Sequence, residues 1–296
     1  MKTIDFSCKH DVLLQSDDGT LKPMDEPYFE SELVAPGTWK IRTDGDYCYL
    51  VEGDEEALMI DTGYGAGNIR EYAQSLTEKP LHNVVNTHDH FDHTANNCYF
   101  DCAFMSEETK PLATVPFPSF EGIDFPRDYP IQVINEGYVF HLGGRDLEVF
   151  KIPDHAVGSI ALLDSRERLL FTGDEIMPMG KPLNGSVERF LGYLKKLKAR
   201  RGEIDRLCAG FGVIEADWIE KYIENMEYIM AGHEGVKPQG GPQFQQMFGP
   251  NGETIYQRKM PHYPDIVGKH DIKEHQLVME YAGCRVTYDS RKVAEP

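Results

Sequence analysis

The chain has 296 residues, of which 30 are basic and 49 acidic, so its formal net charge is −19. Such a surface repels nucleic-acid phosphates and anionic lipids, so we expect a small-molecule partner and neither nucleic acid nor membrane. At this length, a hydrophobic content of 41% is enough for a large core without disulfide bonds.

The sequence contains no apolar run long enough to cross a bilayer, and its first twenty residues lack the apolar region of a secretory signal. Its six cysteines are scattered along the chain, and we interpret them as reduced thiols. We therefore expect a cytoplasmic protein.

The first part of the chain has the pattern of a sheet with one helix. Residues 1–34 are polar and irregular, so we expect an N-terminal extension. Runs rich in β-branched and aromatic residues then alternate with Asp/Gly turns, which predicts an antiparallel meander over 38–43, 47–53 and 56–62. A helix over 68–76 and a buried strand over 81–87 follow.

Residues 101–130 contain five prolines, which predicts a surface loop or lid. The aromatic side chains of this segment either form an apolar substrate wall or anchor the loop on the core.

Regular elements resume after this segment. We predict strands over 138–142, 146–152, 159–164 and 168–174, and helices over 187–198 and 216–230. Residues 232–296 are first rich in Gly, Pro and Gln, and the alternation over 277–290 then predicts a hairpin or an edge strand. We therefore expect one domain over 1–231 and a C-terminal extension over 232–296 that serves as a lid or dimerisation element.

The most informative segment places His88, His90, Asp92 and His93 within six residues, directly after the apolar run LHNVV. Neutral imidazoles are good ligands for an ion such as Zn²⁺. His88 and His90 are two residues apart, so on an extended segment they point the same way and can hold one ion. Asp92 and His93 follow a change of direction and can face a second position.

The run HDHFDH resembles the HxHxDH motif of the metallo-β-lactamase superfamily. Three further segments resemble elements of that family in the same order: LMIDTGYG (58–65) with Asp61, IPDHAVGSIALLD (152–164) with His155, and LLFTGDEI (169–176) with Asp174. The resemblance spans residues 35–231. It is closer to the hydroxyacylglutathione hydrolase and lactonase-like branches than to true β-lactamases, since Asp174 stands where zinc β-lactamases tend to have Cys or Ser.

The resemblance implies an α/β protein with a four-layer αβ/βα sandwich and a two-metal cleft. It places His88, His90 and His155 at site one and Asp92 and His93 at site two. Asp174 would bridge the two sites, and Asp61 would orient a ligand imidazole from outside. The implied cofactor is zinc, as one or two ions, with iron or manganese as alternatives.

One position departs from the family pattern. In LCAGFGVIEADWIEKY (207–222), Phe211 stands where the family usually places a histidine of site two. Site two is then weak or empty, or it holds an extra water, or a histidine from the C-terminal extension completes it. Four histidines lie in that extension: His233, His262, His270 and His275.

We interpret the protein as a metal-dependent hydrolase in which a metal-bound hydroxide attacks an ester, lactone, thioester or amide. Asp92 would orient that hydroxide or accept the proton that the bound water loses. The expected substrate is small and neutral or apolar, and the long extensions are compatible with a homodimer. The basic residues of the predicted helix near 195–201 either hold the anionic part of a coenzyme A or glutathione thioester or form a solvated face. Two other functions remain open: a mononuclear iron oxygenase acting on a sulfur compound, and a non-catalytic binding protein.

Overall fold

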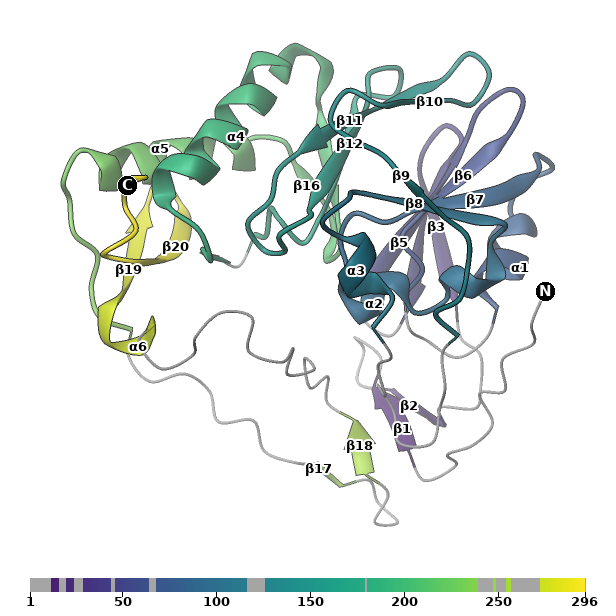
Figure 1. The fold of residues 1–296 in the computed structure, drawn as a ribbon, viewed down its shortest axis with the longest axis horizontal. Helices are drawn as coiled ribbons and strands as arrows, with labels where there is room; N and C mark the ends of the chain where they lie inside the picture. Colours follow the sequence, from purple (N-terminus) through teal and green to yellow (C-terminus); the bar gives the residue numbers. More distant parts are fainter. Residues whose placement is uncertain are drawn as a thin grey trace.

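The computed structural model describes residues 12–15, 20–23, 29–43, 46–63, 68–115, 126–178, 180–238, 247–248, 254–256 and 272–295. Its main body contains two large sheets with helices on their outer sides (Figure 1). No helix in these ranges is both long and apolar enough to cross a lipid bilayer.

The first sheet has seven strands in sequential order, mixed in direction. Its strands are β3 (Glu30–Ala35), β4 (Thr38–Thr43), β5 (Asp46–Glu52), β6 (Ala57–Ile60), β7 (Leu81–Val85), β8 (Cys102–Met105) and β9 (Ile131–Val133). Strands β3 to β6 pair antiparallel, which confirms the predicted meander, whereas β6 to β9 pair parallel. Four short helices connect or flank these strands: α1 (Ile69–Gln74), α2 (Phe91–Thr94), the 3₁₀ turn η1 (Asn97–Tyr99) and α3 (Lys110–Ala113).

The second sheet has six strands, in the order β10, β11, β12, β13, β15, β16. Their bounds are Val139–His141, Asp146–Lys151, Ile160–Asp164, Leu169–Gly173, Arg206–Ala209 and Gly212–Glu215. Strands β12 and β13 are buried along their whole length, as their continuous apolar runs predict.

Two long helices cover the outer face of this second sheet: α4 (Val187–Ala199) and α5 (Trp218–Met230). These two helices confirm the predictions of helices over 187–198 and 216–230. The side chain of Ser186 caps the start of α4 by accepting a hydrogen bond from Arg189 N. The apolar stripe of α4 (Val187, Phe190, Leu191, Leu194 and Leu197) is buried, with the spacing of an amphipathic helix.

The inner faces of the two sheets share one apolar core, in which Ile60 and Val85 of the first sheet pack with Leu162 and Phe171 of the second. Separate cores lie between each sheet and its own helices. The layers therefore run helix, sheet, sheet, helix, as the predicted αβ/βα sandwich requires.

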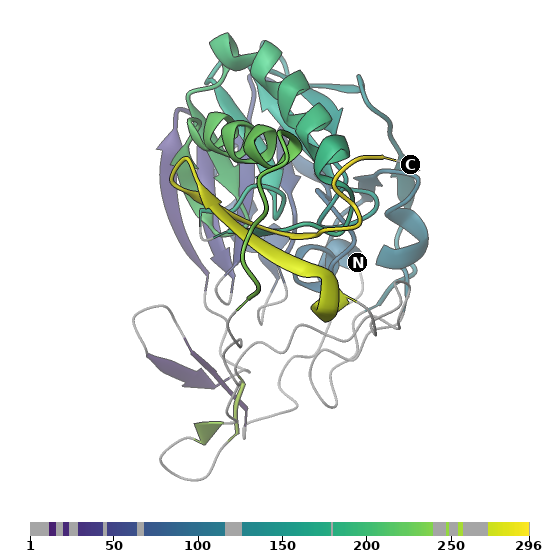
Figure 2. The same cartoon turned by 90° about the vertical axis from the view of Figure 1, so that its left-hand side faces the viewer.

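The C-terminal residues add to the second half of the molecule. Strands β19 (Gln276–Tyr281) and β20 (Cys284–Asp289) form a hairpin, one of the two predicted alternatives, which lies against α5 (Figure 2). Strand β20 also pairs with β14 (Lys181–Pro182), and α6 (Ile272–His275) precedes the hairpin. A small separate sheet pairs segments near the N-terminus, β1 (Val12–Gln15) and β2 (Leu21–Pro23), with β17 (Met247–Phe248) and β18 (Thr254–Tyr256) of the C-terminal extension. The 3₁₀ turn η2 (Arg201–Glu203) follows α4.

The prediction of an irregular surface loop over 101–130 is wrong for residues 102–105 and 110–113. Strand β8 lies inside the first sheet, and α3 follows it. The five prolines all come after β8, so they do not interrupt its four residues. Phe104 and Tyr129 are buried, so these two aromatics pack in the core, whereas residues 116–125 lie outside the described part of the chain.

Arg145 joins the two halves of the sandwich. Its guanidinium lies at the start of the second sheet and is 2% exposed. It forms an ion pair with Asp164 of β12, with Nε to Oδ2 at 2.9 Å, and donates to the carbonyl oxygens of Gly37 and Glu52 in the first sheet, each at 2.9 Å. A buried charge that satisfies this many acceptors fixes the position of one sheet against the other.

We expect Arg145→Met to lower the free energy of unfolding by about 3–5 kcal/mol, because it leaves the Asp164 carboxylate buried without its cation. Denaturant unfolding monitored by circular dichroism measures this loss. Arg166→Met is the control, since the pair of Arg166 with Asp54 is exposed and should contribute less than about 1 kcal/mol. Equal losses in the two variants would contradict the role of Arg145.

Candidate metal centre

The predicted ligands lie at one edge of the two sheets, on segments that follow strand ends. His88 and His90 follow β7, and Asp92 and His93 lie in the short helix α2. His155 lies in the loop between β11 and β12, and Asp174 directly follows β13. The hydrogen bond from Ile160 N to Thr87 O, 2.8 Å long, ties the His155 loop to the His88 segment. Both sheets therefore contribute side chains to one place.

At the first position, the nitrogen atoms of His88, His90 and His155 lie within 4.8 Å of one another. The Nε2 atom of His155 is 2.9 Å from Nδ1 of His90. The rings of His88 and His90 have centroids 4.5 Å apart and stand nearly edge to face. This group can hold one cation with three nitrogen ligands.

At the neighbouring position, the ligand atoms of Asp92 and His93 also lie within 4.8 Å of each other. Asp174 faces both positions with different oxygens: Oδ1 is 3.4 Å from Nε2 of His93, and Oδ2 is 3.6 Å from Nε2 of His155. One carboxylate placed in this way can contact two cations at once.

Asp61 sets the direction of two imidazoles through a buried network. Its Oδ2 accepts hydrogen bonds from Nδ1 of His93, at 2.9 Å, and from Oγ1 of Thr87, at 2.7 Å. Because the Thr87 hydroxyl gives its proton to Asp61, its oxygen accepts the proton on Nδ1 of His88, 3.0 Å away. Both histidines therefore direct an Nε2 lone pair toward the cluster when neutral.

The surroundings of the histidines shift their pKa values in different directions. Burial, reinforced by the neighbouring imidazoles, holds the pKa of His88 well below its ordinary value, and burial also lowers the pKa of His155. Burial opposes charge on His93 as well, but Asp61 and Asp174 outweigh it and raise the pKa of His93 well above its ordinary value. Burial alone would raise the pKa of Asp174, yet the adjacent His93 lowers it to about 2. Two carboxylates thus favour positive charge at this point of the cluster.

The burial and hydrogen bonding of these side chains fit a bound divalent cation. Nε2 of His88 is fully buried and has no hydrogen-bond partner among the described residues. Buried polar atoms normally have a partner, and buried carboxylates are normally paired with a cation. A cation between the imidazoles and carboxylates satisfies both requirements.

Phe211 lies in the turn between β15 and β16, as the alignment with the family pattern places it. The preceding Gly210 packs directly on the centre, since a Cβ at that position would lie 2.2 Å from Oδ1 of Asp174. A benzyl side chain offers no ligand atom, so the protein supplies any further ligand from elsewhere.

The histidines of the C-terminal extension that the structure describes have other surroundings. The exposed ring of His233 stacks on Tyr228, with centroids 3.7 Å apart, and His275 precedes β19. Among the described groups that can hold an ion, neither histidine takes part. His262 and His270 lie outside the described residues.

A buried ion cluster supports the His155 loop. Oε1 of Glu175 accepts hydrogen bonds from the backbone N–H groups of Asp154 and His155, at 3.0 and 2.7 Å. Nζ of Lys181 lies 2.5 Å from Oε2 of Glu175 and 3.1 Å from Oδ2 of Asp154. Asp154 also accepts a hydrogen bond from Gly185 N at 2.9 Å. These contacts tie the His155 loop to β14 and to the segment before α4.

Four of the five basic residues near 195–201 form ion pairs. Lys195 pairs with Glu227 and Lys196 with Glu136. Arg200 and Arg201 likewise pair with glutamates. These contacts favour the interpretation of this segment as a solvated surface over that of an anion site.

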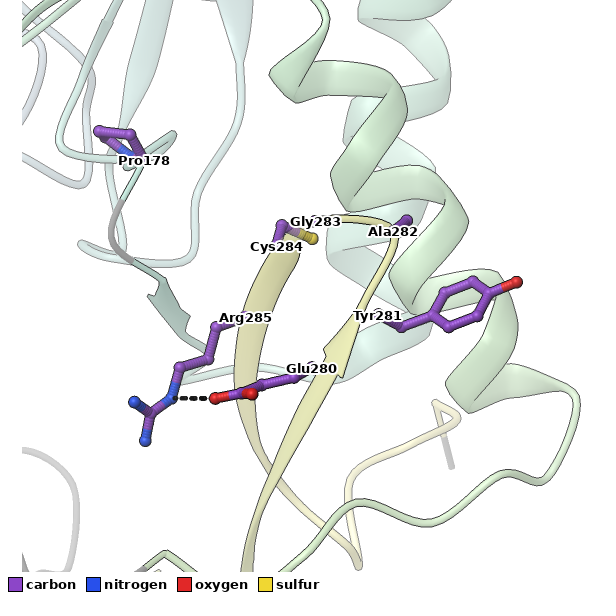
Figure 3. Close-up of a pocket in the computed structure, with 7 residues that line it drawn as sticks. All are labelled: Pro178, Glu280, Tyr281, Ala282, Gly283, Cys284 and Arg285. Atoms are coloured by element: carbon purple, nitrogen blue, oxygen red, sulfur yellow. Dashed lines mark ion pairs between the residues drawn. The ribbon is translucent and has the colours of Figure 1, made fainter.

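A pocket of about 470 Å³ opens at the turn of the β19–β20 hairpin (Figure 3). Its lining residues are Pro178 and residues 280–285, and Arg285 points toward Glu280 across its floor, with an N–O distance of 4.0 Å. None of the predicted ligands lines this pocket.

Sequence reasoning missed several residues around the centre. Thr87 contacts the imidazole of His88, and Glu175 accepts from the backbone N–H of His155. Lys181 acts one step further out, by donating to Glu175.

In the sequence, Asp46 belongs to an Asp/Gly turn and resembles any other turn aspartate. Its place directly before an apolar strand is only a weak indication of a site residue. The structure brings Asp46 to within 4.8 Å of Asp92 and His93.

The fold and this cluster together define a metallohydrolase-type αβ/βα protein, and comparisons with known proteins agree. The chain matches the sequence profile of the metallo-beta-lactamase superfamily over residues 42–233. It is 31% identical over 207 residues to human acyl-coenzyme A thioesterase MBLAC2, an alignment that covers 59% of this chain and 70% of that protein. It is 30% identical over 150 residues to an atrochrysone carboxyl ACP thioesterase of Aspergillus chevalieri, covering 49% of this chain and 44% of that protein.

Solved structures agree on the fold. A metallo-beta-lactamase of Cronobacter sakazakii with the HARLDQ motif superposes with a TM-score of 0.53 at 16% identity, over 71% of this chain and 95% of that one. The chain belongs to the metallo-beta-lactamase superfamily. The predicted family, fold and hydrolase class are thus confirmed.

We expect Asp61→Asn to weaken metal binding by about 10- to 100-fold, because an amide cannot accept all the hydrogen bonds that this carboxylate accepts. Competition with a chromogenic chelator measures the affinity. Asp146→Asn is the matched control, since Asp146 accepts from His141 in an exposed pair. Unchanged affinity in the Asp61 variant would contradict the orienting role.

We expect Lys181→Met to lower the free energy of unfolding by about 3–5 kcal/mol, because it leaves Glu175 and Asp154 buried without their cation. Lys151→Met serves as the control, as its pair with Glu108 is partly exposed and should contribute less than about 1 kcal/mol. Chemical denaturation measures the free energy of unfolding of both variants. Similar losses in the two would contradict the stabilising role of Lys181.

Proposed function

We propose that this protein is a metal-dependent hydrolase of acyl thioesters. The observation that supports this best is the meeting of six ligand-type side chains from two sheets in one buried place, with one oxygen of Asp174 facing each half. Two relatives, the human and the Aspergillus chevalieri proteins, are named as thioesterases. A carbonyl substrate next to such a centre suits the superfamily's hydrolytic chemistry.

Different side chains of the centre would bind metal and transfer protons. His88, His90 and His155, and beside them His93 and Asp92, would hold the cations, which would supply Lewis acidity toward the carbonyl and toward a bound water. Asp92 is 5% exposed, with Oδ2 4.0 Å from Nε2 of His93, and its carboxylate accepts the proton that the attacking water loses. Water adds to the carbonyl carbon, the C–S bond breaks, and the sulfur leaves with the proton as a thiol, with a carboxylic acid as the other product.

The buried thiols do not offer a competing nucleophile. Burial raises the pKa of Cys48 well above its ordinary value, that of Cys208 to about 12 and that of Cys284 to about 11. A thiol is nucleophilic as the thiolate, so these three groups are inert near neutral pH. This supports water as the attacking group.

We extend this proposal to the partner, the metal, the location and the assembly of the protein. The partner is a small molecule, the ions to test first are zinc, manganese and iron, and the protein acts in the cytoplasm, with a homodimer as the assembly to test. The division into a catalytic domain over 1–231 and an extension over 232–296 belongs to the same proposal.

The test is thiol release from acyl-coenzyme A substrates of increasing chain length, compared with chromogenic esters and lactones. We expect thioester turnover that chelation abolishes and added divalent metal restores. His88→Ala and His155→Ala should each lower kcat/KM by more than about 100-fold, since a direct ligand matters more than the groups that orient it.

Two controls make the test specific. His141→Ala should leave turnover unchanged, because that imidazole is exposed and pairs with Asp146. Iodoacetamide should also leave turnover unchanged. Full activity of the chelated enzyme, or of both ligand variants, would contradict the proposal.

A further inference from the structure

The second metal position lacks a ligand that the family usually supplies, and another side chain occupies the space beside it. Phe211 cannot bind a cation. Asp46, the first residue of β5, is fully buried, and its carboxylate lies within 4.8 Å of the ligand atoms of Asp92 and His93. The three side chains form a group that can hold an ion at the second position.

The backbone explains how Asp46 reaches this place. The amide of Tyr47 donates to Gly210 O at 3.0 Å, so the start of β5 is fastened to the turn that carries Phe211. On the other side, Asp46 faces Thr43 across the β4–β5 ladder, and the Thr43 hydroxyl contacts Asp46 O at 3.5 Å. Asp46 therefore enters the centre next to the turn from which the family's histidine would come, but from the opposite sheet.

We propose that Asp46 is a metal ligand of this protein and takes the place of the histidine that Phe211 replaces. It holds a second divalent cation together with Asp92 and His93, with Asp174 shared between the two positions. The inference deepens the proposed function, because it rests on the metal centre described there.

The charge at the centre supports this assignment. Asp46, Asp61, Asp92 and Asp174 are each at most 5% exposed, and Asp46 and Asp92 converge on one point. Buried carboxylates repel each other and need compensating positive charge. Four carboxylates carry four negative charges, which two divalent cations balance and one does not.

The ligand types predict a difference between the two positions. The first offers three imidazoles, whereas the second offers one imidazole and three carboxylates once Asp174 is counted. Oxygen-rich sites suit harder ions such as Mn²⁺, and imidazole-rich sites suit Zn²⁺. We therefore expect the second position to take Mn²⁺ more readily than the first.

The experiment measures metal content without any substrate. Metal-free protein is loaded with Mn²⁺ or Zn²⁺, dialysed and analysed by inductively coupled plasma mass spectrometry. We expect about two equivalents in the wild type, about one in Asp46→Ala, and about two again in the double variant Asp46→Ala/Phe211→His, because the new imidazole restores the missing ligand. Asp54→Ala, which removes an exposed acid, should retain two equivalents.

Two equivalents in Asp46→Ala, or a single equivalent in the wild type, would overturn the proposal. If Asp46→Ala fails to fold, Asp46→Asn keeps the shape of the side chain, and its second ion should bind at least tenfold more weakly. An unchanged second affinity in that variant would also overturn the proposal. A wild type that binds two ions but cleaves no thioester would refute the proposed function and leave the role of Asp46 intact.

Discussion

The centre depends on the hydrogen bonds that Asp61 accepts. Oδ1 binds the amide of Thr87, and Oδ2 binds both the Thr87 hydroxyl and the imidazole of His93. These contacts join the end of β6 to the segment after β7 and fix two imidazoles with one carboxylate. Asp61 itself has a φ of 60°, an unfavourable backbone conformation for a residue other than glycine, which the surrounding hydrogen bonds maintain.

The composition of the centre follows from its place between two sheets. Each sheet ends in short segments that carry polar residues, and the shared apolar core beneath them fixes the distance between the two edges. Tyr49, buried in β5, adds a direct link by donating from Oη to Ala209 O at 2.6 Å. Because both edges meet at the centre, Asp46 of the first sheet lies beside the turn of Phe211 in the second.

The parts of this protein that the sequence predicts well are those governed by local pattern. The HDHFDH run, the buried strands after which Asp61 and Asp174 stand, and the amphipathic helices α4 and α5 all have strong periodicity or an unusual residue density. Order along the chain then places the ligand segments at strand ends. For these reasons the layers of the sandwich and the grouping of the six ligands could be predicted without coordinates.

Other features depend on contacts between distant residues and leave little local pattern. Strand β8 has four residues among loop-like sequence, and its neighbours β7 and β9 make it a strand. Asp46 resembles any turn aspartate until β5 is placed against the β15–β16 turn. Lys181 is an isolated lysine in sequence, and only the fold surrounds it with Glu175 and Asp154.

The pairing of β14 with β20 connects the chain's last strand to chemistry encoded far earlier. β20 pairs with the short strand that carries Lys181, and Lys181 forms an ion pair with Glu175. Glu175 in turn accepts a hydrogen bond from the amide of His155. Through these contacts the C-terminal hairpin supports the loop that carries His155. Loss of the final residues during synthesis or by proteolysis would loosen that support, so an incomplete chain would bear an imperfect centre even though every ligand was already present.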